Sequence, residues 1–263
     1  MTEDAGYRPA PTGSADHNFE NASNPLLLPS PRIGRGAGGE GRTSANLWSA
    51  SPAGSEGHPI LMLVTEPHPH LEIIVSQAVM GGVDIVQWRD KDAGARPLPS
   101  MLRQAAWPAL LIANAPAEIA ARLGVDGRHL PEQSAVTVAE AREALCPSAR
   151  VGRSAHSIAA AVAAQAEGAD YVIAGTIFAS RSHPEIAPAG LEFLREVCEA
   201  VSIPVIAIGG VLSERVADCL GAGAAGVAVL SPILLAADPC AAATEYRLAL
   251  DQALERLRQE WKP

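Results

Sequence analysis

Hydrophobic positions follow one rhythm from His58 to the C-terminal end of the chain. Short apolar runs rich in β-branched residues alternate with alanine-rich segments that show helical spacing. The apolar runs lack polar alternation, as is typical of strands buried on both faces of a parallel sheet. The predicted strands are Ile60–Thr65, Asp84–Trp88, Ala109–Ala113, Gly127–Leu130, Arg150–Ser154, Tyr171–Gly175, Pro204–Gly209 and Gly226–Leu230. The predicted helices are Leu71–Gly81, Leu98–Ala106, Ala117–Leu123, Val138–Leu145, Ile158–Gly168, Leu191–Ala200, Ser213–Gly221 and Pro239–Glu260.

This alternation predicts an α/β fold, a single (β/α)₈ TIM barrel, because about 200 residues accommodate eight strand–helix units. A doubly wound open sheet is the alternative. The segments GGVDIVQ, EGADYVIA and GAGAAGVAV resemble one another, and each ends a helix at glycine and starts a strand. Glycine supplies the left-handed residue that stops a helix.

The first 57 residues differ from the rest of the chain. They are rich in Gly, Pro, Ser, Ala and Asn and show neither helical nor strand periodicity. Such a composition buries too little apolar area to offset the loss of chain entropy. We therefore predict a disordered N-terminal tail over residues 1–57 and a barrel over residues 58–263.

Composition and charge exclude several classes of protein. The 263 residues are 48% hydrophobic and 19% charged, which is a globular balance, and the net charge is −9. No basic stripe is present, so nucleic acid is not an expected partner. The longest apolar run, around 201–212, is too short to span a membrane. The four cysteines form no CxxC pair and predict buried or half-buried free thiols in a reducing cytoplasm. The oligomeric state stays open, a homo-oligomer included.

Active sites in TIM barrels lie where the strands end, and polar or small residues collect there in this chain. Gly209, Gly210 and Ser231 follow strands seven and eight, where glycines let backbone N–H groups approach a phosphate. Lys91 is one of only two lysines, against eighteen arginines, and is a candidate point charge for an anion. The complete candidate binding set is Gln87, Arg89, Lys91, Asn114, Ser154, Gly190, Gly209, Gly210, Leu230 and Ser231.

Three residues are candidates for the catalytic chemistry. His156 stands just beyond strand five and can face the mouth, and an imidazole titrates near neutral pH. His183 lies in the long loop after strand six, a natural position for a lid. Thr176 ends strand six. His129 lies within strand four, where we expect an interior, hydrogen-bonded histidine.

Several ordered motifs make the chain resemble the thiamine phosphate synthase/TenI family from about residue 60 to residue 250. They are QWRDK (87–91), LLIAN (110–114), RLGVDGRHLP (122–131), VGRSAHS (151–157), GADYVIAGTIFASRSHP (168–184), SIPVIAIGGV (202–211) and GAAGVAVLSPI (223–233). The resemblance implies a thiazole phosphate as the small-molecule substrate, bound at the glycines after strands seven and eight.

Two activities occur in this family. The synthase couples hydroxymethylpyrimidine diphosphate to thiazole phosphate with magnesium, and the TenI-type tautomerase moves a proton so that a thiazole carboxylate phosphate becomes aromatic. The synthase pattern implies carboxylates at the positions of Ala115 and Ser134, which alanine and serine do not supply. The tautomerase pattern implies a histidine where Thr176 stands. His156 or His183 would have to take over the role of that histidine.

The departures from both patterns set the order of the hypotheses. A tautomerase, which is an isomerase, ranks first, with His156 as the proton carrier. A synthase, which is a transferase, ranks second. A non-catalytic binder of thiazole or thiamine phosphate ranks third. We expect no metal ligands and no cofactor, with magnesium needed only if the chain is a synthase. Tight ligand binding without turnover would identify the binder.

Overall fold

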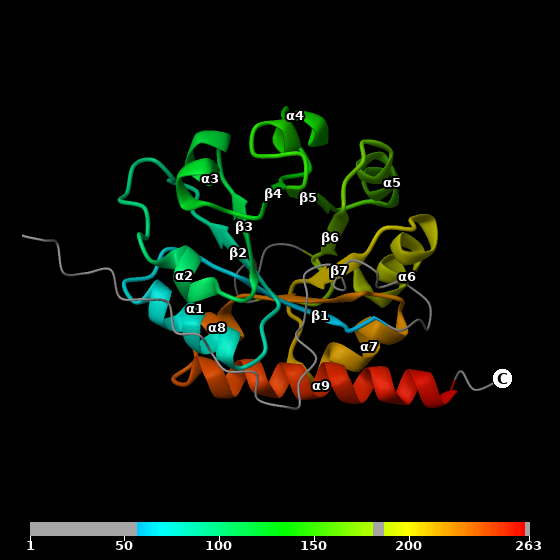
Figure 1. Ribbon diagram of the computed structural model, residues 1–263. Coiled ribbons are helices and arrows are strands. Elements are labelled where there is room, and N and C mark those ends of the chain that lie inside the picture. The colour runs from blue at the N-terminus through cyan, green and yellow to red at the C-terminus, as the bar shows by residue number, and fades with distance from the viewer. Residues whose placement is uncertain (1–56, 181–186, 261–263) are drawn as a thin grey trace, which may run out of the picture. The chain divides into compact units, whose positions relative to one another are not determined.

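The computed structural model describes residues 57–180 and 187–260, and these form a closed barrel of parallel strands in sequential order (Figure 1). The predicted TIM barrel is confirmed, and β1 pairs with β8 to close it. The strands are β1 (Ile60–Val64), β2 (Ile85–Arg89), β3 (Leu110–Asn114), β4 (Gly127–Leu130), β5 (Arg150–Ala155), β6 (Tyr171–Gly175), β7 (Val205–Ile208) and β8 (Gly226–Val229).

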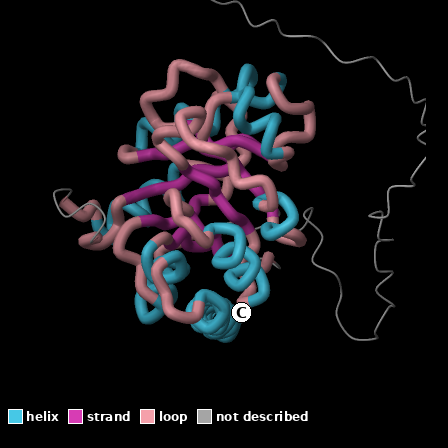
Figure 2. The backbone as a smooth tube through the Cα atoms, turned by 90° about the vertical axis from the view of Figure 1, so that its left-hand side faces the viewer, coloured by secondary structure: helices cyan, strands magenta, loops and turns pink. Residues whose placement is uncertain are grey.

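Helices surround the strands, as Figure 2 shows. They are α1 (Leu71–Met80), α2 (Leu102–Ala106), α3 (Ala117–Leu123), α4 (Val138–Glu143), α5 (Ile158–Ala166), α6 (Gly190–Ala200), η2 (Ser213–Arg215), α7 (Val216–Gly221), α8 (Ser231–Leu234) and α9 (Pro239–Glu260). Two differences from the sequence prediction stand out. Helix α2 starts four residues late, because the residue before Pro99 is disfavoured in helical conformation. Helix α8, a single turn, was not predicted.

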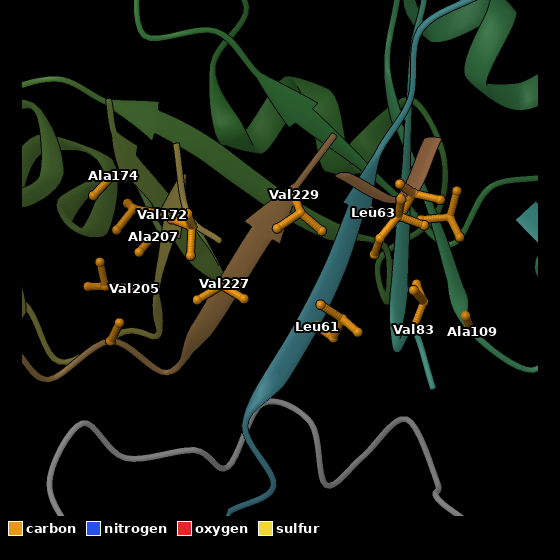
Figure 3. Close-up of a cluster of buried hydrophobic side chains, with 14 of the residues drawn as sticks. Leu61, Leu63, Val83, Ala109, Val172, Ala174, Val205, Ala207, Val227 and Val229 are labelled. Atoms are coloured by element: carbon orange, nitrogen blue, oxygen red, sulfur yellow. The ribbon is translucent and has the colours of Figure 1, made fainter. Parts of the chain in front are cut away.

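Strand residues alternate between two apolar layers. Inward-facing residues such as Ile60, Met62 and Ile206 fill the barrel. Outward-facing residues such as Leu61 and Val227 pack under the helices, and Figure 3 shows part of this outer layer. Because both layers are largely apolar, most of the strands are nearly continuous hydrophobic runs, whereas β4 and β5 also contain arginine, histidine and serine. Most polar side chains of the barrel therefore lie near the ends of the strands.

Three aspartates at the N-terminal ends of even-numbered strands repeat one contact; we call Asp84, Asp126 and Asp170 the rim aspartates. Each carboxylate accepts a hydrogen bond from a backbone N–H of the preceding strand, at 2.8–2.9 Å. Each also pairs with arginine: Arg247 with Asp84, Arg103 with Asp126, and both Arg142 and Arg150 with Asp170.

Two of the rim aspartates, Asp84 and Asp170, belong to the repeated segments found in the sequence, and Asp126 stands in a similar setting. Before each of them stands a glycine with positive φ, namely Gly82, Gly124 and Gly168, as expected for the helix stop. Gly223 repeats the glycine before β8, but Ala225 takes the place of the aspartate. Without a carboxylate, Ala225 is joined to the preceding strand only by a backbone hydrogen bond, which its N–H donates to the Val205 carbonyl at 2.8 Å.

We expect Asp170→Ala to lower the free energy of unfolding by about 2–3 kcal/mol. The substitution leaves Arg142, Arg150 and the Val151 N–H without their shared acceptor, and only 17% of the Asp170 side chain is exposed. Urea unfolding measures the change. The matched control is Asp92→Ala, because Asp92 is 61% exposed and should cost less than about 0.5 kcal/mol. Equal losses in both variants would contradict the assigned role.

The cysteine prediction is correct in part. All four cysteines are free; Cys198 and Cys219 are buried and Cys240 is half-buried, but Cys146 is exposed. Burial raises the pKa of the Cys198 and Cys219 thiols to about 12. None of the described helices combines the length and hydropathy that crossing a membrane requires. The predicted tail lies almost wholly outside the described residues, so its disorder stays a prediction.

Candidate active site at the mouth of the barrel

One side of the mouth, formed by β2 to β5, carries polar side chains; we call it the polar side. Alternation along β2 turns Gln87 and Arg89 inward with Ile85. Arg89 stands beside Asn114 in the strand register. Gln87 is 3% exposed and lies under Arg89, with its amide nitrogen 3.8 Å from the Met62 sulfur. Arg89 is open to the mouth, since 26% of its side chain is exposed and its only ion pair within the described residues, to Glu66, is 3.9 Å long.

His129 and Ser154 form a contact inside the barrel. His129 Nε2 lies 2.9 Å from Ser154 Oγ, and the ring stacks on Tyr171 with 5.7 Å between ring centroids. The expectation of an interior, hydrogen-bonded histidine is confirmed. Burial and the nearby Arg89 charge lower the pKa of His129 to about 3. The imidazole is therefore neutral near pH 7 and holds the Ser154 hydroxyl near the C-terminal end of β5.

We expect His129 to make the protein acid-sensitive. Its folded pKa of about 3 lies below the unfolded value near 6.5, so the unfolded chain takes up a proton as the pH falls and stability is lost. Between pH 7 and pH 5 this group alone should remove about 2 kcal/mol from the free energy of unfolding. Urea titrations of wild type and His129→Gln at both pH values measure it. The variant should show a shallower pH dependence, and identical slopes would contradict the prediction.

The three candidate catalytic residues differ in their surroundings. His156 is directed to the surface: its side chain is 63% exposed, and its Nδ1 lies 2.9 Å from Glu132 Oε2. The same carboxylate accepts the His156 N–H at 2.5 Å, so the ring is held over the loop after β4. Thr176 is half-buried, and its carbonyl accepts the Ala189 N–H at 2.8 Å. His183 lies outside the described residues.

The opposite side of the mouth carries the glycines predicted for phosphate binding. Gly209 and Gly210 follow β7 with φ of 98° and 62°, a backbone that residues with a Cβ rarely adopt. A Cβ on Gly209 would come within 2.8 Å of the Thr176 Cα, and one on Gly210 within 2.8 Å of the Phe178 carbonyl oxygen. The chain after β6 therefore lies directly against these glycines. We call residues 209–211 the glycine loop.

The unpredicted helix α8 lies next to the glycine loop in the barrel order. It starts at Ser231 with Leu230 as its N-cap, and Pro232 stands in its first turn. A short extra helix after the last strand, with its N-terminus near the loop after the seventh, is the common phosphate site of this fold. The Ser-Pro pair was the available signal, since proline favours the first turn of a helix. Gly190 is less suited as a donor, because its N–H already binds the Ile177 carbonyl at 3.0 Å.

Lys91 is exposed in the turn that follows Arg89, beyond the end of β2. Beside this turn, a cavity of about 420 Å³ lies between the loops that follow β1 and β2. Trp88, which faces away from the barrel interior, lines it. The remaining lining residues are Pro67, His68, Pro69, Leu71, Glu72, Asp90, Arg96, Pro97 and Pro99.

The polar side does not fit a protein-bound magnesium ion. Ala115 and Ser134 supply no carboxylate, and Glu132 is occupied by His156. Over residues 57–180 and 187–260, no three His, Cys, Asp or Glu side chains come together as a metal-binding group. Magnesium needs hard oxygen ligands, preferably carboxylates. The carboxylates near the end of β2, Glu66 and Asp90, are each paired with an arginine, so the described residues there offer no group of carboxylates to a metal.

Comparison with known proteins agrees with this architecture. The family described as thiamine monophosphate synthase matches residues 61–233. The thiamine-phosphate synthase of Methanoculleus marisnigri is 42% identical over 176 residues, covering 65% of this chain and 83% of the relative. That of Chloroflexus aurantiacus is 37% identical over 191 residues, covering 70% and 87%. The solved structure of a thiamine phosphate pyrophosphorylase from Pyrococcus furiosus has a TM-score of 0.64 and 29% identity, covering 75% and 98%. The chain therefore belongs to the thiamine monophosphate synthase family.

Proposed function

We propose that this protein is a thiamine-phosphate synthase, which joins hydroxymethylpyrimidine diphosphate to a thiazole phosphate. The relatives named above carry this activity in their names, and they favour the second of the three hypotheses drawn from the sequence over the first. The thiazole ring nitrogen forms a bond to the methylene carbon of the pyrimidine, and diphosphate leaves from that carbon.

The observation that carries the proposal is the two-sided mouth. The polar side presents Arg89 and Lys91, and the opposite side presents the glycine loop and the start of α8. A transferase that joins a diphosphate to a monophosphate needs two separate anion sites around one reaction centre. An isomerase of the thiazole carboxylate phosphate would also need a phosphate site and a cation for the carboxylate, but it needs in addition a group that carries a proton.

The described histidines do not favour a proton shift. A proton carrier works best with a pKa near the working pH, but burial lowers the pKa of His129 to about 3. His156 is largely exposed and faces Glu132 rather than the mouth, which argues against the proton carrier that the sequence favoured. Thr176 is a poor acid or base at neutral pH.

Each side of the mouth then has a distinct task. Arg89 and Lys91 stabilise the negative charge that grows on the departing diphosphate. Ser154, held by His129, donates a hydrogen bond to the pyrimidine substrate. The glycine loop and Ser231 bind the thiazole phosphate and direct the ring nitrogen toward the methylene carbon. The barrel floor of apolar side chains excludes water from the reacting carbon.

Assay of the purified protein tests the proposal. Incubation with hydroxymethylpyrimidine diphosphate and thiazole phosphate should yield thiamine phosphate and diphosphate in equal amounts. A parallel incubation with the thiazole carboxylate phosphate should show no proton shift. Isomerisation without coupling would identify the tautomerase, and tight binding without either reaction would identify the binder.

Magnesium removal is a separate prediction from the same assay. Because the described mouth has cations in place of metal-binding carboxylates, we expect the coupling rate to change less than about tenfold when a chelator removes magnesium. Coupling rates at saturating substrate, with and without an excess of chelator over magnesium, measure this. A steep rise of the coupling rate with magnesium would contradict this prediction.

A further inference from the structure

All three carbonyl groups of the glycine loop are held by donors from other parts of the chain. The Gly209 carbonyl accepts the Phe178 N–H at 2.9 Å. The Gly210 carbonyl accepts Arg215 Nη1 at 3.0 Å, and the Val211 carbonyl accepts the Tyr246 hydroxyl at 2.9 Å. Three donors from the loop after β6, from η2 and from α9 therefore fix one short stretch of backbone.

Fixing a carbonyl also fixes the next N–H group. The cis peptide bonds of the described chain lie elsewhere, so the peptides of the glycine loop are trans. In a planar trans peptide the C=O and the following N–H point in opposite directions. The Phe178 bond thus sets the direction of the Gly210 N–H, and the Arg215 bond sets that of the Val211 N–H. These are two of the donors that the glycine loop offers to a phosphate.

Arg215 also contacts the neighbouring loop. Its guanidinium carbon lies 4.7 Å from the centroid of the Phe178 ring, within cation–π range. A Cβ on Gly210 would come within 2.8 Å of the Phe178 carbonyl oxygen, so the backbone of Phe178 lies close against Gly210. One half-buried arginine therefore contacts both the backbone of the glycine loop and the ring of Phe178, whose own backbone lies against that loop.

We propose that Arg215 is the positioning residue of the phosphate site, setting the direction of the Val211 N–H and keeping Phe178 against the glycine loop. The proposal rests on the phosphate placement given under the proposed function. Arg215 acts through the backbone and need not touch the substrate. The thiazole phosphate, or inorganic phosphate in its place, is the ligand that depends on it.

Phosphate titration of wild type and Arg215→Met tests the proposal. Methionine keeps the aliphatic stem but removes the donor and the charge. We expect the Kd for inorganic phosphate to rise at least about tenfold. In amide NMR spectra at saturating phosphate, the Val211 N–H should respond less than in wild type. The Gly210 N–H, whose direction depends on the Phe178 backbone bond and only indirectly on Arg215, should change less than the Val211 N–H.

Two further variants separate the geometry from the charge. Arg195→Met removes an equal charge from the surface of α6, where Arg195 pairs only with Glu192 among the described residues, and should leave the phosphate Kd unchanged. Arg215→Lys keeps the charge and one donor, and should recover part of the affinity. Wild-type affinity in Arg215→Lys, or an equal loss in Arg195→Met, would reduce the effect to charge and overturn the proposal.

The proposed function and this inference fail in different ways. If wild type shows no phosphate response at Gly210 or Val211, the phosphate placement is wrong. If wild type responds at both and Arg215→Met binds phosphate equally well, only the role of Arg215 is wrong. Near-UV circular dichroism of each variant establishes that the compared proteins are folded.

Discussion

Gly210→Asp is expected to abolish detectable binding of thiazole phosphate and to lower kcat/KM for coupling by at least about 10³-fold. Gly210 has a φ of 62°, and a side chain there meets the Phe178 and Ala179 carbonyl oxygens. The new carboxylate would also lie against the substrate phosphate, and like charges in contact cost several kcal/mol. Calorimetric titration and steady-state kinetics measure the two losses.

Gly124→Asp is the matched control. Gly124 has the same φ of 62°, but a Cβ there meets nothing within 4 Å, and it lies at the other end of the barrel, after α3. The variant therefore carries the same backbone strain and the same added charge. It should bind and couple like wild type while losing some stability. Unchanged affinity in a folded Gly210→Asp variant would show that the phosphate lies elsewhere.

Arg89→Met is expected to lower kcat for coupling by about 10²–10³-fold with a smaller change in KM. Arg89 faces the mouth next to Asn114, and Glu66, 3.9 Å away, is its one ion-pair partner in the described part of the chain. A guanidinium in this position stabilises the departing diphosphate more than the bound substrate, so its removal affects kcat. Folding should be little affected, because an exposed, long ion pair contributes little.

The control for Arg89 is Arg122→Met, on the exposed face of α3. It removes the same charge far from the mouth and should leave both constants within about twofold. A wild-type kcat in Arg89→Met would mean that another cation carries the leaving group. Lys91, two residues further along the chain, is then the next variant to measure.

The strands were predictable because the physical signal is strong. Most are runs of largely apolar residues bounded by glycine or a polar residue, and each of the eight predicted runs overlaps an observed strand, with ends that agree to within one residue. Short helices carried less information. The four residues of α8 make little more than one turn, which is too short to show helical periodicity. Helix α2 was predicted too long because the apolar Leu98 outweighed the effect of Pro99.

The mouth was predictable only as a set of positions. The rule that active sites lie at strand ends selected Arg89, Asn114 and Gly210 without any knowledge of contacts. The contact between His129 and Ser154 depends on the register of β4 and β5, in which His129 stands opposite Gly152. Sequence spacing does not contain that register. Arg215 was missed for a similar reason, since its role depends on the path of the chain after β6.

The missing fourth rim aspartate has a thermodynamic consequence. Three quarters of the barrel have a carboxylate joining two strands at the N-terminal rim, but the quarter of β7 and β8 has Ala225 there. That quarter also bears the glycine loop and α8. A phosphate bound at the C-terminal end of this quarter would bridge β7 and β8, the two strands that no rim aspartate connects. Ligand binding and cooperative closure of the barrel are then linked, and substrate should slow amide hydrogen exchange most in β7 and β8.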